Sequence, residues 1–308
     1  MLPPLPNLPD TQRATGSFPV RYEDIAQDGR LLLEASTTAL GAAVWGPRIT
    51  KHPLNTYMRE ARIVPILTRL VVEGTPGPFS VIGRLTANGA FQLAHARAAN
   101  GDVDRIFLDM WAEVTAPIGR THGPAPERAG ETITAGRIFA EHVFTRLFAA
   151  PAERKVTRFD AAGIIALPAV PESQREARAL PAILDLPTGA VALDPELRVD
   201  PTPVVFGITH TDSNQHVNSL VYPRLFEDAA LRRFASLGKS SAVLARALEI
   251  GFRKPCFAGE TMRIALRAYT LGEKIGAVGV YVTEKDAASD ATLAAARPHA
   301  YVHTLFEK

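Results

Sequence analysis

The last third of the chain shows a regular pattern of apolar segments separated by short polar breaks. Four of these segments have the length and the Val, Ile, Leu and aromatic content of β-strands. They cover residues 244–253, 260–271, 275–284 and 296–307. Before them, residues 219–238 place apolar side chains at helical spacing and end at Gly238, a common helix stop. With a further apolar run at 201–210, this part of the chain predicts a strand, a long helix and then four strands.

The first third repeats this order of elements in a less regular form. Two Asn-Gly pairs, Asn88-Gly89 and Asn100-Gly101, interrupt runs of mixed apolar and polar residues. Asn-Gly favours tight hairpin turns because both residues tolerate positive φ. The stretch before them has helical spacing, with a kink expected at Pro65. The predicted elements are a strand region, a long helix and a three-stranded antiparallel meander, at residues 30–45, 54–74 and 79–114.

The segment between the two halves has less clear periodicity. Residues 134–148 have helical spacing, whereas the later part is rich in Ala and Pro. We interpret residues 118–200 as a linker between an N-terminal domain at 16–117 and a C-terminal domain at 201–308. Because strands and helices do not alternate regularly, a doubly wound parallel fold is disfavoured. The pattern favours an α+β fold in which each half has one long helix against an antiparallel sheet.

Composition excludes several classes of function. With 46% hydrophobic and 21% charged residues the chain resembles a globular protein, and no apolar run is long enough for a membrane helix. The net charge of +2, with scattered basic residues, does not form the stripe that nucleic acid binding requires. A single cysteine, Cys256, excludes an intrachain disulfide and a cysteine-based zinc site. The start MLPPLPNLPD is unlike a secretory signal, so we expect an extended, poorly ordered tail on a cytoplasmic protein.

A cluster of polar residues precedes the predicted helix of the second half. The segment HTDSNQHVNSLVYPRLFEDA, residues 210–229, has Asp, two Asn and His at alternate positions and a Tyr four residues further on. A loop in this place lies near the amino end of a helix, where free backbone N–H groups and the helix dipole favour negative charge. The cluster therefore has the groups for a base, an orienting side chain and an oxyanion donor. These residues are Asp212, Asn214, His216, Asn218 and Tyr222.

The same segment resembles the motif of hotdog-fold acyl thioesterases, D-x-x-x-H-x-N-x-x-x-Y, which precedes the central helix of that fold. Its inner part DSNQHVN is similar to D-x-N-Q-H-V-N of plant-type acyl-acyl-carrier-protein thioesterases, which carry two hotdog domains in one chain. The resemblance implies two tandem hotdog domains that pair as an intrachain pseudo-dimer. Where the plant-type enzymes have aromatic-Arg-Arg-Glu-Cys, this chain has FRKPC, with Pro255 in place of Glu and Cys256 kept. The segment GFRKPCFAGETMRI and Glu227 also fit the pattern of bacterial 4-hydroxybenzoyl-CoA-type thioesterases.

The resemblance implies hydrolysis of an acyl thioester carried on coenzyme A or on an acyl carrier protein, without a cofactor, as in fatty acid or polyketide metabolism. Asp212 either activates a water molecule or attacks the carbonyl directly, and the sequence does not choose between the two. Asn214 and His216 position the reacting groups, and backbone N–H groups near Asn218 polarise the carbonyl oxygen. Glu227 is a further acid or base. The side chains expected to contact substrate are those of Asn218, Tyr222 and Cys256.

Structural explanations of the same residues stay open. Asp212 and Asn214 fit a turn and a helix cap, and Asn218 fits an N-cap. His216 alone fits a hydrogen-bonded structural histidine, and Cys256 fits a small core residue. A metal site formed by His210, Asp212 and His216 is a rival explanation, although no fourth ligand is evident and we expect no metal.

Rival functions also remain at this stage. A hotdog hydratase or dehydratase acts on the same class of thioesters, and a non-catalytic protein binds them without hydrolysis. In the first half, residues His52, Asn55, Tyr57 and Glu60 resemble part of the motif, but Lys51 stands where an acid is expected. We therefore expect one site per chain, with the first half forming a wall of an apolar acyl pocket. We expect no nucleic acid or membrane partner, and association of whole chains into a homo-oligomer is left open.

Overall fold

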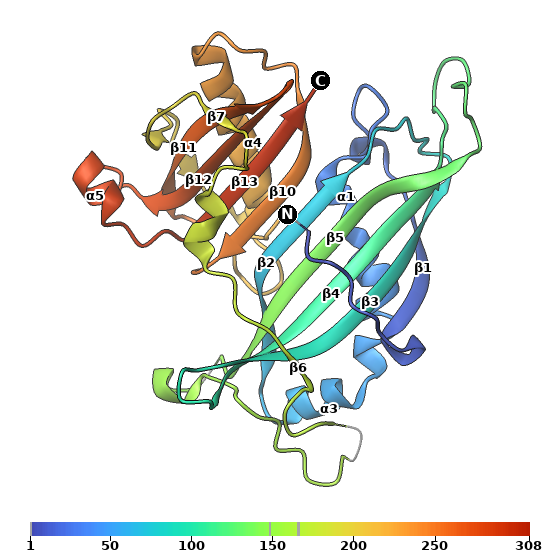
Figure 1. Ribbon diagram of the computed structural model, residues 1–308, viewed down its shortest axis with the longest axis vertical. Coiled ribbons are helices and arrows are strands. Elements are labelled where there is room, and N and C mark those ends of the chain that lie inside the picture. Colours follow the sequence, from blue (N-terminus) through green and yellow to red (C-terminus); the bar gives the residue numbers. More distant parts are fainter. Residues whose placement is uncertain (1, 148, 165–166) are drawn as a thin grey trace. The chain divides into compact units, whose positions relative to one another are not determined.

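The computed structural model describes residues 2–147, 149–164 and 167–308, and it contains two compact units, Met1–Ala177 and Arg178–Lys308. Each unit is an antiparallel sheet with helical segments against one face (Figure 1). This is the hotdog arrangement expected from the sequence, used twice. The boundary between the units falls inside the segment that we interpreted as a linker, because residues after 118 still contribute a long strand to unit 1.

Unit 1 is built on five long strands in the order β1-β3-β4-β5-β2. A short strand, β6, pairs in parallel with β3. The bounds are β1 Arg13–Pro19, β2 Val64–Gly74, β3 Arg84–Arg97, β4 Val103–Pro117, β5 Thr132–Thr145 and β6 Ser173–Gln174. The helix predicted at 134–148 is therefore wrong, because residues 134–145 belong to β5, and residue 148 lies outside the described residues. Flanking strands cover both edges of β5, so its near-continuous apolar run reflects burial and not helical spacing.

The helices of unit 1 lie elsewhere than the sequence predicted. The strand region predicted at 30–45 is helical, and the long helix predicted at 54–74 is a short helix followed by a strand. The bounds are α1 Leu33–Ser36, α2 Thr38–Leu40, a π-helical turn Gly41–Trp45 and α3 Pro53–Glu60, with β2 starting at Val64. Ala39, Ala43 and Val44 are fully buried, so the first helical stretch has no clear polar face to show its period.

A close approach of this helical stretch to the sheet explains why the hairpin turn predicted at Asn88-Gly89 does not form. Strand β3 runs straight through Asn88-Gly89, which we predicted as a hairpin turn, and only Asn100-Gly101 turns the chain. A Cβ at Gly89 would lie 2.7 Å from the carbonyl oxygen of Ala43, and one at Gly16 only 2.2 Å from that of Ala42. These glycines allow the helix to pack against β1 and β3, so Gly89 serves packing and not a turn.

The N-terminal segment is extended, as predicted, but it docks on unit 1 and is not a loose tail. It crosses the sheet face opposite the helices (Figure 1). The indole Nε1 of Trp111 donates to the carbonyl oxygen of Pro3 (3.2 Å). Leu2 and Leu8 pack against a buried cluster of Val71, Trp111 and Phe139. Burying these apolar groups offsets the entropy lost on ordering a proline-rich segment that is already stiff.

Unit 2 matches the sequence prediction closely. Its sheet has the order β10-β13-β12-β11, and three short strands pair with β11. The bounds are β7 Val191–Ala192, β8 Arg198–Val199, β9 Val204–Val205, α4 Val221–Ser236, β10 Leu244–Phe252, β11 Thr261–Leu271, β12 Lys274–Thr283, α5 Asp290–Ala294 and β13 Ala300–Glu307. The long helix and the four strands are confirmed. The strand predicted at 201–210 shrinks to β9, and a 3-10 turn, Ile208–His210, takes its end.

Helix α4 packs on the sheet of unit 2 through one apolar stripe. The buried side chains recur at spacings of three to four residues, as expected for a helix with one face in the core. They are Tyr222, Phe226, Ala229, Ala230 and Phe234. On the polar side, Arg233 pairs with the buried Asp194, and Arg232 pairs with the buried Asp200 (2.6 Å). The helix ends before Gly238, whose φ is 67°.

The other short helices connect these elements. They are 3-10 turns with the bounds Asp10–Gln12, Tyr22–Asp24, Ile49–Lys51, Pro151–Glu153 and Leu180–Leu184. In the part of the chain that the structure describes, no helix combines the length and the apolar character needed to cross a membrane.

Candidate functional site

The polar cluster of the sequence forms a closed loop directly ahead of α4. We call residues 208–220 the motif loop. Thr211 and Val217 form an isolated antiparallel bridge, and the N–H of Asp212 donates to the carbonyl of His216 (3.0 Å). The N–H of Gln215 donates to the carbonyl of Asp212 (2.9 Å), and Gln215 has a φ of 63°. The seven residues from 211 to 217 thus form a tight, hydrogen-bonded hairpin, which holds their side chains in fixed directions.

Asp212 lies near the start of this hairpin and is partly exposed. Its Oδ1 accepts a hydrogen bond from the backbone N–H of Asn214 (2.8 Å). This Asx-type turn orients the carboxylate and engages one of its oxygens. Asp212 therefore stabilises a turn, which was the structural explanation of this residue from the sequence. The same bond presents the second oxygen in a fixed place, so the turn and a chemical role are compatible.

His216 and Asn214 differ in their surroundings. The ring of His216 is partly buried and meets the ring of Phe257 edge-on, with 5.3 Å between centroids. Phe257 is 41% exposed, and its N–H donates to Oε2 of Glu260 (2.9 Å). The side chain of Asn214 is exposed. The structure thus brings His216 to the turn between β10 and β11, and it leaves Asn214 at the tip of the loop.

Asn218 joins the motif loop to α4. Its Oδ1 accepts from the N–H of Leu220 (2.9 Å), and its carbonyl accepts from the N–H of Val221 (3.0 Å). Its side chain thus holds the turn that leads into α4, but the N-cap of that helix is Leu220, so the expectation that Asn218 is the N-cap is wrong.

The backbone donors near Asn218 are largely occupied. The N–H of Val217 donates to the carbonyl of Cys256 (2.9 Å), and that of Asn218 donates to the carbonyl of His210 (2.9 Å). The N–H groups of Val217 and Asn218 are therefore engaged within the protein and are not free to polarise a substrate carbonyl. Among residues 217–220, all of which the structure describes, the N–H of Ser219 is the one without an acceptor in the protein.

Tyr222 and Cys256, which the resemblance implied as substrate contacts, are 2% and 0% exposed. The N–H of Cys256 donates to the hydroxyl of Tyr222 (3.1 Å), and the Tyr281 hydroxyl donates to the Tyr222 carbonyl (2.6 Å). Burial raises the pKa of the Cys256 thiol to about 11, so it stays protonated at neutral pH. A buried thiol of this kind is a poor nucleophile. The polar atoms of both residues face the interior of unit 2.

Two residues of this region were missed by the sequence reasoning. Nδ1 of His299 lies 3.2 Å from Sγ of Cys256, and burial lowers the pKa of His299. Glu260 lies close enough to Tyr222, Cys256 and His299 to influence all three electrostatically. His299 stands in a segment that reads as a strand, and no local spacing links it to the motif loop. Glu227 lies on α4 and is partly buried.

A metal explanation finds no support in the geometry. The predicted strand would have pointed His210 and Asp212 to the same side, but His210 ends a 3-10 turn. Its Nδ1 accepts from the N–H of Gly207 (3.2 Å), and its ring packs against Phe206. The described residues include no group of three or more His, Cys, Asp or Glu side chains placed to hold a metal ion.

Unit 1 contains the same backbone loop ahead of its own helical stretch. Ile25 and Leu31 form an isolated antiparallel bridge. The N–H of Ala26 donates to the carbonyl of Arg30 (2.8 Å), and that of Gly29 donates to the carbonyl of Ala26 (2.9 Å). Gly29 has a φ of 88°. The bridge, both hydrogen bonds and the positive φ match those of the motif loop residue by residue.

The chemistry of the two loops differs. Where unit 2 has Asp212, Asn214, His216 and Asn218, unit 1 has Ala26, Asp28, Arg30 and Leu32. Asp28 carries an acid at another position of the loop, and it forms an ion pair with Arg30. The residues that we compared with the motif, His52 to Glu60, belong to the start and body of α3 and not to this loop. That comparison was wrong because the helix of unit 1 was misplaced in the sequence.

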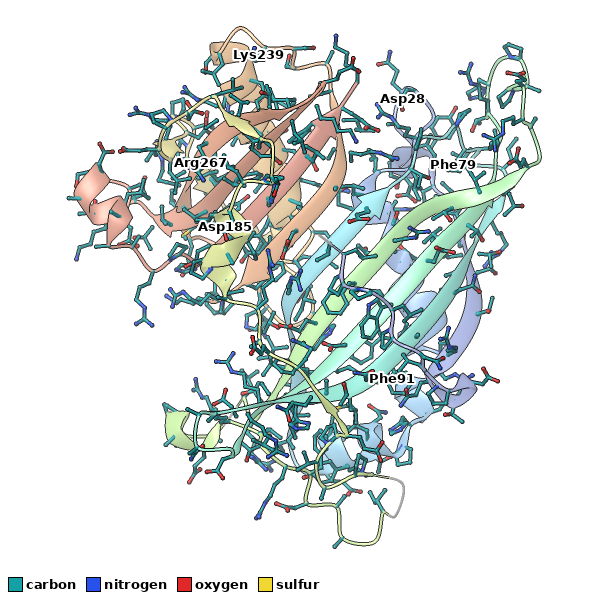
Figure 2. All side chains as sticks on the ribbon, viewed as in Figure 1. Asp28, Phe79, Phe91, Asp185, Lys239 and Arg267 are labelled. Atoms are coloured by element: carbon teal, nitrogen blue, oxygen red, sulfur yellow. The ribbon has the colours of Figure 1, made fainter. Side chains whose placement is uncertain are left out.

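A cavity of about 350 Å³ adjoins the loop of unit 1. Asp28 and Phe79 line this cavity and lie at the same end of unit 1 (Figure 2). The N–H of Phe79 donates to the carbonyl of Gly29 (2.7 Å). The cavity has no carboxylate at the place of Asp212. The absence of an acid at Ala26 agrees with the expectation of one motif per chain. That expectation was based on residues 52–60, which are not the equivalent loop.

No protein family model matches the chain, and no curated protein sequence matches it. Solved structures do match over nearly the whole length. A protein provisionally described as an oleoyl thioesterase from Lactobacillus plantarum has a TM-score of 0.58 at 12% identity, covering 96% of this chain and 95% of that one. An acyl-ACP thioesterase from Bacteroides thetaiotaomicron has a TM-score of 0.55 at 12% identity, with coverages of 97% and 99%. A 12:0-ACP thioesterase from Umbellularia californica has a TM-score of 0.51 at 12% identity, with coverages of 98% and 99%.

These neighbours show the fold. The chain has the double hotdog fold of acyl-ACP thioesterases, as its motif and element order led us to expect. At 12% identity the likeness concerns the course of the backbone, and the roles of individual side chains have to be argued from this chain alone.

Proposed function

We propose that the protein hydrolyses an acyl thioester at the motif loop of unit 2. The observation that carries the proposal is the fixed carboxylate of Asp212, held by the Asn214 N–H in a loop that leads directly into α4. Ahead of α4 this carboxylate stands in the same loop as the N–H of Ser219, which has no acceptor in the protein, and near the positive end of the helix dipole. The spacing of the surrounding residues is that of hotdog thioesterases, and the full-length structural neighbours are described as such.

In the proposed reaction, the carboxylate of Asp212 accepts a proton from a water molecule, and the oxygen of that water attacks the carbonyl carbon of the thioester. The carbon–sulfur bond then breaks, the thiolate takes up a proton, and a free acid and a thiol leave. Direct attack by Asp212, followed by hydrolysis of the resulting anhydride, gives the same products. His216 orients the water or the thioester. The N–H of Ser219 is the donor that we assign to the carbonyl oxygen, because neighbouring donors are occupied.

The substrate class that we propose is an acyl group on coenzyme A or on an acyl carrier protein. Two of the structural neighbours are described as acyl-ACP thioesterases, which supports a carrier-bound acyl group. Hydrolysis of this kind uses only protein groups and water, so we propose no cofactor. The proposal places no role on Cys256, whose thiol is buried and protonated.

The proposal is tested by thiol release from a substrate panel. The panel contains short-, medium- and long-chain acyl-CoA thioesters, benzoyl-CoA and the corresponding acyl-ACPs. Asp212→Asn keeps an oxygen that accepts the Asn214 N–H but removes the base, so turnover should fall by roughly two to four powers of ten. Asp228→Asn, on the exposed side of α4, is the matched control and should keep the parent rate.

Several outcomes would reject the proposal. An Asp212→Asn variant with the parent rate would remove the carboxylate from the mechanism. Hydration of enoyl-CoA without release of thiol would favour a hydratase. Binding of acyl-CoA without any turnover, seen by calorimetry across the whole panel, would favour a non-catalytic binding protein.

A further inference from the structure

The motif loop is tied to a neighbouring turn of unit 2 by one residue outside the loop. Cys256 lies in the turn between β10 and β11, and its carbonyl accepts the N–H of Val217 (2.9 Å). Val217 is also the bridge partner of Thr211. The position of the Cys256 carbonyl therefore sets where one leg of the motif loop lies, and His216 and Asn218 are its immediate neighbours in the chain.

Cys256 itself is held by two side chains. Its N–H donates to the hydroxyl of Tyr222 (3.1 Å), and its Sγ lies 3.2 Å from Nδ1 of His299. All three residues are buried, with exposed fractions of 0%, 2% and 4% for Cys256, Tyr222 and His299. In such a setting a hydrogen bond is not in competition with water, so losing one partner leaves a buried polar atom unsatisfied.

His299 is rigidly placed by its own backbone. Its N–H donates to the carbonyl of Tyr281 (2.8 Å) on β12, at the start of the pairing of β12 with β13. Its carbonyl accepts the N–H groups of Arg253 (2.9 Å) and Lys254 (3.1 Å). His299, which directly precedes β13, is therefore held at a defined point beside the same turn that its carbonyl anchors.

We propose that His299 is a positioning residue for the motif loop: its Nδ1 holds the thiol of Cys256 and so fixes the carbonyl that accepts the Val217 N–H. The path from sheet to loop is His299, Cys256 and Val217, with each step a contact in the structure. Its effect on catalysis rests on the proposed thioesterase function, whereas its effect on the loop does not. In this proposal Cys256 transmits the position of His299 to the motif loop, whereas the resemblance implied that Cys256 contacts substrate.

Hydrogen exchange of the Val217 amide tests the loop part without any substrate. In His299→Ala, exchange of this amide should become at least about tenfold faster, because the bond to Cys256 opens more often. His299→Asn, whose side-chain amide can place either an accepting oxygen or a donating nitrogen where Nδ1 stood, should restore protection. The matched control is His303→Ala, because His303 is also buried in unit 2 but bonds to Tyr269, away from the loop. It should leave Val217 protected even if the unit is destabilised.

A double-mutant cycle tests whether His299 acts through Cys256. Cys256→Ala and His299→Ala should each speed exchange of Val217, and the double variant should exceed the larger single effect by no more than about twofold. Cys256→Ser keeps a hydrogen-bonding group and should behave more like the parent than Cys256→Ala does. Fully additive effects in the cycle would overturn the proposed path.

The catalytic part is measured on the same variants with the best substrate of the panel. Because a small displacement of the reacting groups slows the chemical step strongly, His299→Ala should lower kcat by about tenfold or more per folded molecule. His299→Asn should recover most of the lost kcat. His303→Ala should keep the parent kcat per folded molecule. Unchanged Val217 exchange in His299→Ala would overturn the proposal. Faster exchange in a protein that hydrolyses nothing would instead reject the proposed function and leave the positioning role standing.

Discussion

Gln215 and Gly29 occupy equivalent positions in two loops of the same backbone geometry, and both have positive φ, 63° and 88°. In each loop the residue's N–H donates to the carbonyl three residues earlier, at 2.9 Å in both cases. Glycine adopts this conformation without cost, whereas other L-residues are destabilised in it. The two units thus share a turn, and unit 2, which carries the motif, holds it with a residue less suited to positive φ.

We predict opposite responses to substitution at these two positions. Gly29→Ala should lower the free energy of unfolding of unit 1 by about 1–3 kcal/mol, because of the positive φ and of crowding. A Cβ at this position would lie 2.6 Å from Cβ of Pro78. Gln215→Gly should be neutral or stabilise unit 2 by up to about 1 kcal/mol.

Denaturant unfolding measures both effects. The only two tryptophans of the chain, Trp45 and Trp111, lie in unit 1, so their fluorescence follows that unit. Unit 2 is followed by hydrogen exchange of β12 amides. Gln215→Val serves as a contrast, because a β-branched residue at positive φ should destabilise by about 1–2 kcal/mol. A stable Gly29→Ala variant would mean that the loop of unit 1 relaxes to another turn.

A second prediction concerns which of the two loops supplies the carboxylate needed for turnover. Asp28 in unit 1 is paired with Arg30, which lowers its pKa against the opposing effect of burial, and no acid stands at Ala26. Asp28→Asn should therefore leave turnover within about twofold of the parent, while Asp212→Asn removes most of it. Steady-state thiol release measures both. A large loss of turnover in Asp28→Asn would show that unit 1 takes part in the chemistry.

A third prediction concerns acid sensitivity of unit 1. His142 is 8% exposed, its ring meets Trp45 edge-on, and burial lowers its pKa to about 4. Because the folded-state pKa lies below the value of 6.5 for a free histidine, the folded state favours the neutral ring. The stability that His142 contributes is present above about pH 6.5 and is lost as pH falls towards about 4.

The expected size follows from the two pKa values. Between about pH 7 and about pH 5, protonation of His142 in the unfolded chain should cost unit 1 about 2 kcal/mol. His142→Phe keeps a ring against Trp45 and should remove this loss, even if it lowers stability at neutral pH. Urea unfolding followed by tryptophan fluorescence at the two pH values gives the comparison. An equal loss in parent and variant would assign the acid sensitivity to other groups.

The architecture of unit 2 could be predicted from the sequence because α4 has one buried face and the strands are apolar runs separated by short polar breaks. In α4 the buried Tyr222, Phe226 and Phe234 recur at helical spacing, and Gly238 ends the helix. The motif could be found for a similar reason. Its residues lie within one loop, so their spacing along the chain reflects their spacing in the folded protein.

Unit 1 was harder to predict because tertiary contacts override local pattern there. Its helical stretch at 33–45 buries Ala39, Ala43 and Val44 but exposes only the uncharged Thr38 and Gly41, so no polar stripe reveals a period. Asn88-Gly89 looks like a hairpin turn, yet the glycine is needed where the helix touches β3. These errors also moved our comparison of the two loops to the wrong segment.

The sequence by itself determined the two tandem α+β units, the long helix and four strands of unit 2, and the polar motif ahead of that helix. Tertiary structure alone decided that the same loop recurs at residues 25–31, that the N–H groups of Val217 and Asn218 are occupied, and that His299 meets Cys256. Local spacing carries the first group because those residues interact with near neighbours. The second group depends on contacts between distant segments, which exist only once the sheets have formed.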